Sequence, residues 1–252
     1  MGILRTPDAL VHIDADIQEL KAILKEKTAP LIIAFIDLAG STPLKEKHPQ
    51  ETWLPIIARF LSLVSKQVIH SHGNVVKYIG DEIMAVFPNV DNLGAQRAES
   101  FVWECEKALS DEGDIYAAKY AIDCGEAARI QDNQEADDFL GTCVDRCARI
   151  AKIALPHTAV GTGQFVSMSK NPNSWSDVGE FEVRGLKDPV RILQLRNLGP
   201  QIGGKEAGMI LAGSRSAIAA LVEAEEALLS CKETLALCKQ ELSRLQTLQG
   251  SD

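Results

Sequence analysis

Hydrophobic side chains in this chain gather in short runs, separated by longer segments in which they recur every three or four positions. The runs are rich in β-branched and aromatic residues, as is typical of strands, and cover residues 31–36, 75–79 and 83–87. The helical spacing extends over residues 43–68, 92–109 and 141–155. The pattern therefore predicts an α+β domain.

The order of these elements narrows the fold. Residues 115–124 alternate as a strand that continues as an arm at 128–131, whereas the polar and acidic residues 131–138 predict a loop. Strand, helix, hairpin, helix and strand is the βαββαβ order of a ferredoxin-like sandwich. Further along, we expect a strand at 158–161 and a closing hairpin formed by residues 181–185 and 189–195.

Three segments flank the domain that we expect at residues 28–197. Residues 1–27 predict a helical segment with an apolar face, and the glycine-rich residues 198–214 predict a linker. In residues 215–252, leucines recur every seven positions, at 221, 228, 235 and 242. This heptad pattern predicts a C-terminal helical extension that either pairs in a coiled coil or lies back on its own domain.

Composition excludes several classes of protein. The net charge of −9 argues against a nucleic-acid partner, because neutralising phosphates requires an excess of Lys and Arg. No signal peptide or long uncharged apolar stretch is present, so we expect no membrane partner and a cytoplasmic location. The six cysteines include no C-x-x-C pair and the five histidines are scattered, which argues against a zinc site.

Two acidic residues have equivalent positions in the predicted sheet. Asp37 directly follows the apolar run 31–36, and Asp81 lies at the tip of the predicted hairpin. A charge at the mouth of a buried strand requires a metal ion or a cationic partner. If the hairpin pairs beside the strand, the two carboxylates and the backbone N–H groups of residues 40–42 form a site for a magnesium nucleotide. The alternative for Asp81 is an ordinary solvated turn.

Three strings carry a resemblance to a known family. They are Phe-Ile-Asp-Leu-Ala-Gly-Ser-Thr at 35–42, Lys-Tyr-Ile-Gly-Asp-Glu-Ile-Met-Ala-Val-Phe at 77–87, and Asp-Phe-Leu-Gly-Thr-Cys-Val-Asp-Arg-Cys-Ala-Arg-Ile at 138–150. In this order and spacing the chain resembles the class III nucleotidyl cyclases over roughly residues 28–197. The resemblance implies an enzyme that converts a nucleoside triphosphate into the 3′,5′-cyclic nucleotide and pyrophosphate.

The resemblance also implies the groups that hold the metals and phosphates. Two divalent metal ions, Mn²⁺ or Mg²⁺, are expected on Asp37 and Asp81, with the backbone carbonyl of Leu38 as a further ligand. The β- and γ-phosphates are expected on Gly40, Ser41 and Thr42. Together these residues would bind the metal ions and the polyphosphate end of the nucleotide.

Basic residues are expected at the reacting phosphate. Arg149 matches the family arginine that stabilises the developing charge, and its alternative role is a surface ion pair. Arg184 lies near the position of a family residue that binds the triphosphate, and Lys187 is the alternative.

Asp145 replaces the asparagine that positions the ribose in most members. An ionised Asp only accepts hydrogen bonds, so ribose positioning differs here.

The identity of the base has two interpretations. Lys77 and Asp138 occupy the positions that read the base edge in family members active on adenine, which favours ATP. The single-domain architecture and Asp145 instead resemble the stand-alone pyrimidine cyclases of bacterial anti-phage Pycsar systems. We expect UTP before CTP, with ATP as the alternative.

The resemblance further implies partners. In this family the complete site lies between two protomers, so a head-to-tail homodimer with two equivalent sites is expected. A downstream effector that binds the cyclic nucleotide is also expected. The contrasting hypothesis is an inactive cyclase fold that serves as a scaffold through its C-terminal heptads.

Overall fold

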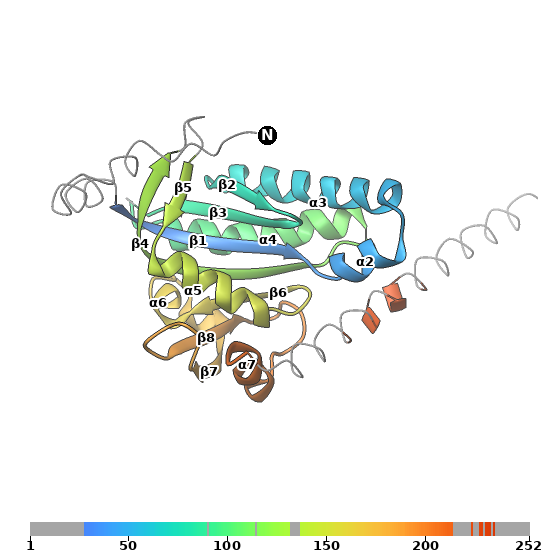
Figure 1. The fold of residues 1–252 in the computed structure, drawn as a ribbon. Helices are drawn as coiled ribbons and strands as arrows, with labels where there is room; N and C mark the ends of the chain where they lie inside the picture. The colour runs from blue at the N-terminus through green and yellow to red at the C-terminus, as the bar shows by residue number, and fades with distance from the viewer. Residues whose placement is uncertain are drawn as a thin grey trace, which may run out of the picture.

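The computed structural model describes residues 28–89, 91–113, 115–131 and 137–213, together with positions 223, 227, 228, 230–232 and 234. In these parts an eight-stranded mixed sheet forms the centre and helices cover both of its faces (Figure 1). The predicted α+β class is therefore confirmed. The N-terminal helical segment predicted at residues 1–27 lies outside the described residues.

The first four strands form the predicted ferredoxin-like core. They are β1 (Thr28–Leu38), β2 (Asn74–Ile79), β3 (Glu82–Pro88) and β4 (Ala118–Gln131). β1 lies between β3 and β4 and pairs with both in antiparallel register, which gives the order β2-β3-β1-β4. The sheet then continues from β4 through β6 (Thr158–Thr162) and β8 (Val190–Leu195) to β7 (Trp175–Phe181), while β5 (Asp137–Leu140) pairs with the end of β4.

Helices connect these strands and cover the sheet. They are α2 (Ser41–Lys47), α3 (Gln50–His70), α4 (Gly94–Glu112), α5 (Thr142–Ile150), α6 (Gly163–Val166) and α7 (Gly204–Leu211), with 3₁₀ turns at Ala151–Ile153 and Pro172–Ser174. In the described part of the chain, none of the helices combines the length and hydrophobicity that a membrane span requires.

Burial on both faces explains the unbroken apolar run in β1. Ile32 and Ile36 belong to the core cluster that β1 shares with α3 and α4, whereas Ile33 and Phe35 belong to the cluster on the opposite face with α5 and α7. Successive side chains of a strand point to opposite faces, so a strand between two helical layers needs apolar residues at every position. β1 is thus a fixed platform, and Asp37 lies near its carboxyl end.

Three predicted boundaries differ from the structure. The first strand of the closing hairpin ends at Phe181 instead of beginning there, and β7 has few apolar residues because it is the last strand of the sheet. The loop predicted at 131–138 ends earlier, because β5 begins at Asp137. The helix predicted at 141–155 is α-helical only to Ile150 and continues as a 3₁₀ turn.

The glycine-rich residues 198–214 contain a packed helix instead of an extended linker. Ala207, Ile210 and Leu211 of α7 are buried in the cluster beneath α5. Helical spacing of these three side chains is present in the sequence, but Gly203, Gly204 and the other glycines around them conceal it. The domain limits at 28 and 197 stay a prediction, since α7 adds to the same core.

One turn of the C-terminal extension contacts its own domain. Leu228 and Lys232 line a small cavity together with Gly40 and Pro156, and the Lys232 ammonium lies 3.0 Å from Nε2 of His157. This contact favours the interpretation in which the helix lies back on the domain. Most of the heptad positions, on which the coiled-coil interpretation depends, lie outside the described residues.

Candidate functional site

The two predicted carboxylates lie together at one end of the sheet. β1 and β3 are neighbours in register, with Ile36 opposite Ile83, so the turn between β2 and β3 brings Asp81 beside Asp37. Asp81 lies close enough to Asp37 that its charge is among the causes that raise the pKa of the Asp37 carboxyl. The predicted hairpin therefore has the geometry that the metal-site hypothesis requires, whereas the role of the two residues as metal ligands stays a prediction.

Two lysines that the sequence analysis did not identify neutralise this pair. Lys45 of α2 places its ammonium nitrogen 2.5 Å from Oδ1 of Asp81, and Lys119 of β4 places its own 2.9 Å from Oδ2 of Asp37. Lys119 lies directly across the ladder from Asp37, so the strand register accounts for that contact. Pairing residues 31–38 with residues 118–124 as antiparallel strands would have placed Lys119 opposite Asp37 and so identified it.

The acidic groups differ in their readiness to ionise. Burial raises the pKa of Asp37 to about 6, against the opposing effect of Lys119. Burial acts in the same direction on Asp81, but hydrogen bonds from Lys45 and Ser41 outweigh it and lower the pKa of that carboxyl below its usual value. Burial, followed by the charges of Asp37 and Asp81, raises the pKa of Glu82 to about 7. Asp81 is thus the carboxylate that is most firmly ionised.

The carboxylate oxygens of Asp37 and Asp81 suit divalent metal ions whose coordination is completed by a bound ligand. In the described part of the chain, no cluster of three or more His, Cys, Asp and Glu side chains is arranged to hold a metal by itself. Mg²⁺ is commonly held by one or two carboxylates, with water and substrate phosphates completing its shell. Two adjoining carboxylates that attract two ammonium groups provide the negative charge and the oxygen atoms for that arrangement.

The turn between β1 and α2 lies next to the carboxylates. Gly40 has a φ of 76°, which places it in the left-handed region where glycine is favoured. Ser41 is buried and its hydroxyl bonds to Asp81, while Thr42 is exposed. The three predicted phosphate-binding residues therefore adjoin the predicted metal ligands.

The two predicted base-reading residues are paired with each other. The Lys77 ammonium lies 2.8 and 2.7 Å from the two carboxylate oxygens of Asp138. Lys77 is on β2 and Asp138 is on β5. These two strands are not neighbours in the sheet order, but they approach each other in space. The Asp138 carboxylate also accepts a hydrogen bond from the backbone N–H of Phe139 at 2.8 Å. Tertiary structure thus brings together two residues that are 61 positions apart.

The predicted basic residues gather at the loop between β7 and β8. Nη1 of Arg149 donates to the backbone carbonyl of Arg184. Gly185, at a φ of +81°, lies beneath the guanidinium, and a Cβ there would come within 3.0 Å of Nη2 of Arg149. Arg184 and Lys187 are both exposed in this loop, and Asp145 is exposed one turn before Arg149 on α5.

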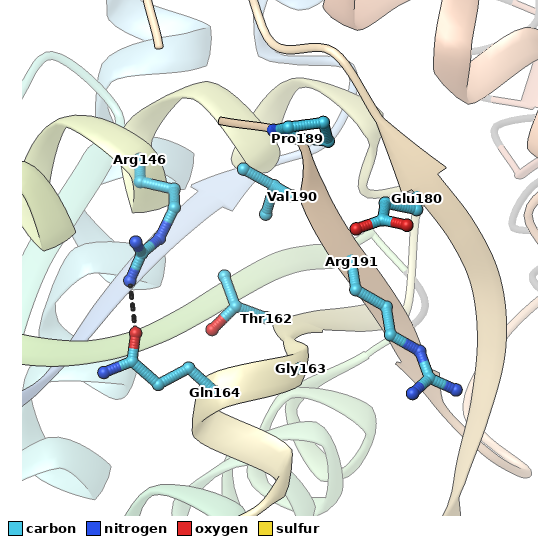
Figure 2. Close-up of a pocket in the computed structure, with 8 residues that line it drawn as sticks. All are labelled: Arg146, Thr162, Gly163, Gln164, Glu180, Pro189, Val190 and Arg191. Atoms are coloured by element: carbon cyan, nitrogen blue, oxygen red, sulfur yellow. Dashed lines mark hydrogen bonds between the residues drawn. The ribbon is translucent and has the colours of Figure 1, made fainter. Parts of the chain in front are cut away.

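Arg146, also on α5, has a different environment. Its Nε and Nη2 donate to the Asp123 carboxylate over 2.6 and 3.0 Å, and Asp123 also accepts from Thr162 over 2.5 Å. Asp123 is fully buried, and burial raises its pKa despite the arginine. Figure 2 shows Arg146 and its partner Gln164 on one wall of a pocket above Gly163, with Arg191 on the opposite side. The sequence analysis missed this cluster, because Asp123 lies inside a predicted strand.

Comparisons with known sequences give distant relatives. No family profile matches the chain. Two uncharacterised proteins of Mycobacterium tuberculosis are 25% identical to it, over 171 and 174 residues, which is 64% of this chain in both cases. The aligned regions are 32% and 31% of those proteins, so the chain spans less than a third of the length of the curated relatives it matches.

Comparisons with solved structures identify the fold. The adenylyl cyclase CyaB of P. aeruginosa matches with a TM-score of 0.57 at 20% identity, over 68% of this chain and 98% of that one. The catalytic core of a rhodopsin-guanylyl cyclase with converted specificity, solved with ATPαS, gives 0.60 at 17% identity, over 67% and 96%. The guanylate cyclase domain from Catenaria anguillulae, solved with GTP, gives 0.58 at 14% identity, over 69% and 100%. The chain therefore has the fold of class III cyclase catalytic domains.

Proposed function

We propose that this chain is a nucleotidyl cyclase domain that converts a nucleoside triphosphate into its 3′,5′-cyclic nucleotide and pyrophosphate. The observation that carries the proposal is the adjoining pair of Asp37 and Asp81, set beside the turn at residues 40–42 in a fold shared with adenylyl and guanylyl cyclases. Cyclisation requires the ribose 3′-oxygen to attack the α-phosphorus while pyrophosphate leaves. Each group of residues described above meets one requirement of that reaction.

Asp37 and Asp81 would hold two divalent ions, with the carbonyl of Leu38 as an additional ligand. Bound there, the ions supply charge that favours loss of the 3′-hydroxyl proton and offsets the charge on the phosphates. Gly40, Ser41 and Thr42 keep the polyphosphate beside these carboxylates. A preorganised polyphosphate holds the α-phosphorus in line with the attacking oxygen.

The second half of the site binds the reacting phosphoryl group and the nucleoside. Arg149 stabilises the negative charge that develops in the transition state, and Arg184 or Lys187 binds the leaving pyrophosphate. Asp145 accepts a hydrogen bond from a ribose hydroxyl. Its exposed carboxylate suits an acceptor that meets the ligand from solvent.

The two halves belong to different protomers in this proposal. In a head-to-tail homodimer, the carboxylates of one copy face Lys77, Asp138 and Arg149 of the other, and each dimer contains two equivalent sites. Two inactive variants, Asp81→Ala and Arg149→Ala, then complement each other when mixed. In a one-to-one mixture about a quarter of wild-type activity returns, because half of the dimers are mixed and each has one intact site. Failure to regain activity would contradict the shared site.

For the base we propose uracil, with a cyclic pyrimidine nucleotide as a signal in anti-phage defence. The Lys77–Asp138 pair favours a second candidate, ATP, because a donor and an acceptor side by side match the edge of adenine. The two candidates differ in what the paired residues do. With ATP they separate to bind the base, and with UTP they stay paired beside a smaller ring.

The test is an assay of purified protein with Mn²⁺ and ATP, GTP, CTP or UTP in turn, measuring cyclic nucleotide and pyrophosphate. We expect product from UTP before CTP, whereas product from ATP would favour the second candidate. No product from any of the four would overturn the proposal in favour of an inactive scaffold. Plaque counts on cells expressing the wild type or Asp81→Ala test the defence role, which requires that only the wild type protects.

A further inference from the structure

Lys45 of α2 lies where a bound metal ion and a bound phosphate would both change its contacts. Lys45 is a third exposed, and its ammonium contacts the carboxylate that is most firmly ionised, Asp81, at 2.5 Å. It lies four positions after Ser41, so both side chains project from one face of α2. The same ammonium is therefore close to the predicted metal ligand and to the turn of residues 40–42.

A metal ion on Oδ1 of Asp81 would take the place of the observed lysine contact. Metal–oxygen distances near 2.1 Å leave no room for an ammonium on the same carboxylate oxygen. Repulsion between the two cations acts in the same direction. A metal ion on that oxygen therefore displaces Lys45.

The other lysine of the site is held more firmly. The Lys119 side chain is only 15% exposed, and its backbone is fixed in the ladder between β1 and β4. Lys45, on a helix of seven residues and 34% exposed, has a flexible side chain with access to solvent. Of the two ammonium groups, that of Lys45 is the one free to move.

We propose that Lys45 is an additional triphosphate-binding residue, which takes the place of the metal on Asp81 in the empty site and transfers to the polyphosphate when the metal binds. This inference rests on the proposed function for the position of the polyphosphate beside residues 40–42. Lysine is a common phosphate ligand, and the polyphosphate is the anion nearest to an ammonium displaced from Asp81. Metal and triphosphate then strengthen each other's binding, since each one removes a competitor of the other.

The proposal predicts effects of opposite sign in a single variant. Lys45→Met removes the competitor on Asp81, so Mn²⁺ alone, measured by electron paramagnetic resonance, binds at least about threefold more tightly. The same change removes a phosphate contact, so inorganic tripolyphosphate at fixed free Mn²⁺, measured by calorimetry, binds about tenfold more weakly. Lys47→Met is the matched control, because Lys47 is an exposed lysine of the same helix. It changes neither affinity beyond the small effect of net charge.

The outcomes separate this inference from the proposed function. Equal affinities in Lys45→Met and Lys47→Met would overturn the inference, as would weaker Mn²⁺ binding in Lys45→Met, which would make Lys45 only a positioning residue for Asp81. In an Asp81→Ala background the effect of Lys45→Met on Mn²⁺ must vanish, and an effect that persists would also overturn it. Neither binding measurement requires turnover, so a protein that cyclises none of the four nucleotides contradicts only the proposed function.

Discussion

Two carboxylate clusters in this molecule both pair aspartates with basic side chains, and they differ in how completely the carboxylate charges are satisfied. In the first, Asp37 and Asp81 adjoin each other and pair with Lys119 and Lys45, at side-chain exposures of 14% to 34%. In the second, Asp123 is fully buried and accepts hydrogen bonds from Arg146, Thr162 and its neighbouring backbone N–H. Their different surroundings indicate different roles.

The Asp123 carboxylate receives its hydrogen bonds from neighbouring groups of the chain. A buried carboxylate that is satisfied by a bidentate arginine and a hydroxyl joins β4, α5 and β6, and replacing it with a neutral residue would leave the Arg146 charge unpaired. In the Asp37–Asp81 cluster, the lysine contact of Lys45 with Asp81 is one that a stronger cation can displace. Exposed and replaceable partners distinguish the candidate metal site from a structural ion pair.

Two arginines on α5 extend the comparison. Arg146 is committed to Asp123, whereas Arg149, one turn later, donates a hydrogen bond to the backbone carbonyl of Arg184 in the exposed loop between β7 and β8. A guanidinium has five N–H donors, so the hydrogen bond to the Arg184 carbonyl leaves Arg149 donors for a phosphate. The helix thus carries one arginine for stability and one for the proposed chemistry.

The largest expected effect comes from removing a carboxylate of the exposed cluster. Asp81→Ala lowers the rate of cyclic nucleotide formation at least about a thousandfold, since metal-ion charge stabilisation is worth several kcal/mol. Thermal unfolding changes by only a few degrees, because this cluster is at the surface end of β1. Asp177→Ala, which breaks an exposed ion pair with Arg191, is the control and retains activity. Cyclisation that persists in Asp81→Ala would make the two clusters functionally equivalent.

The buried cluster should respond in stability. Asp123→Ala leaves Arg146 without its partner and lowers the free energy of unfolding by about 3 to 5 kcal/mol, measured by urea denaturation. Thr162→Val removes one hydrogen bond to the same carboxylate and costs about 1 to 3 kcal/mol. An Asp123→Ala variant as stable as the wild type would contradict the structural role assigned to this cluster.

Replacing Arg149 or Arg146 should have a smaller effect on the catalytic rate than replacing Asp81, and the two variants should differ from each other. Arg149→Ala lowers kcat about a hundredfold and changes KM much less, because its donors act on charge that develops in the transition state. Arg146→Ala acts on stability instead, through Asp123. Steady-state kinetics and urea denaturation of both variants check the difference, and a rise in KM alone for Arg149→Ala would assign it to substrate binding only.

The smallest expected effect is a pH dependence of stability. Burial and neighbouring charges raise the pKa of Glu82 to about 7 in the folded protein. The contribution of this group to stability is therefore fully present at a pH below its ordinary pKa of 4.5, and it is lost as the pH rises through 7. Glu82→Gln, which cannot ionise, should match the wild type at pH 4 and exceed its stability by about 2 kcal/mol at pH 8. Urea denaturation at both values measures this, and equal stability at pH 8 would place Glu82 in solvent.

Most of the core fold could be predicted from the sequence, because its signals are local. The apolar run of β1, the hairpin around Gly80 and the helical stripes each depend on nearest neighbours along the chain, and together they gave the βαββαβ order. Helix α7 was predicted as a linker and strand β7 was placed too late in the sequence, because the signals of both elements are weak. Glycines surround α7, and an edge strand has only one neighbour and needs fewer apolar side chains.

The sequence by itself determined which carboxylates and arginines were available and put Asp37 and Asp81 at the ends of adjacent strands. Only the tertiary structure decided which cation each of them meets. Lys119 faces Asp37 through strand register, Lys45 meets Asp81 across 36 positions, and Lys77 meets Asp138 across 61. Such contacts depend on how distant elements pack, and no local pattern along the chain specifies the distance between two charges that separate elements bring together.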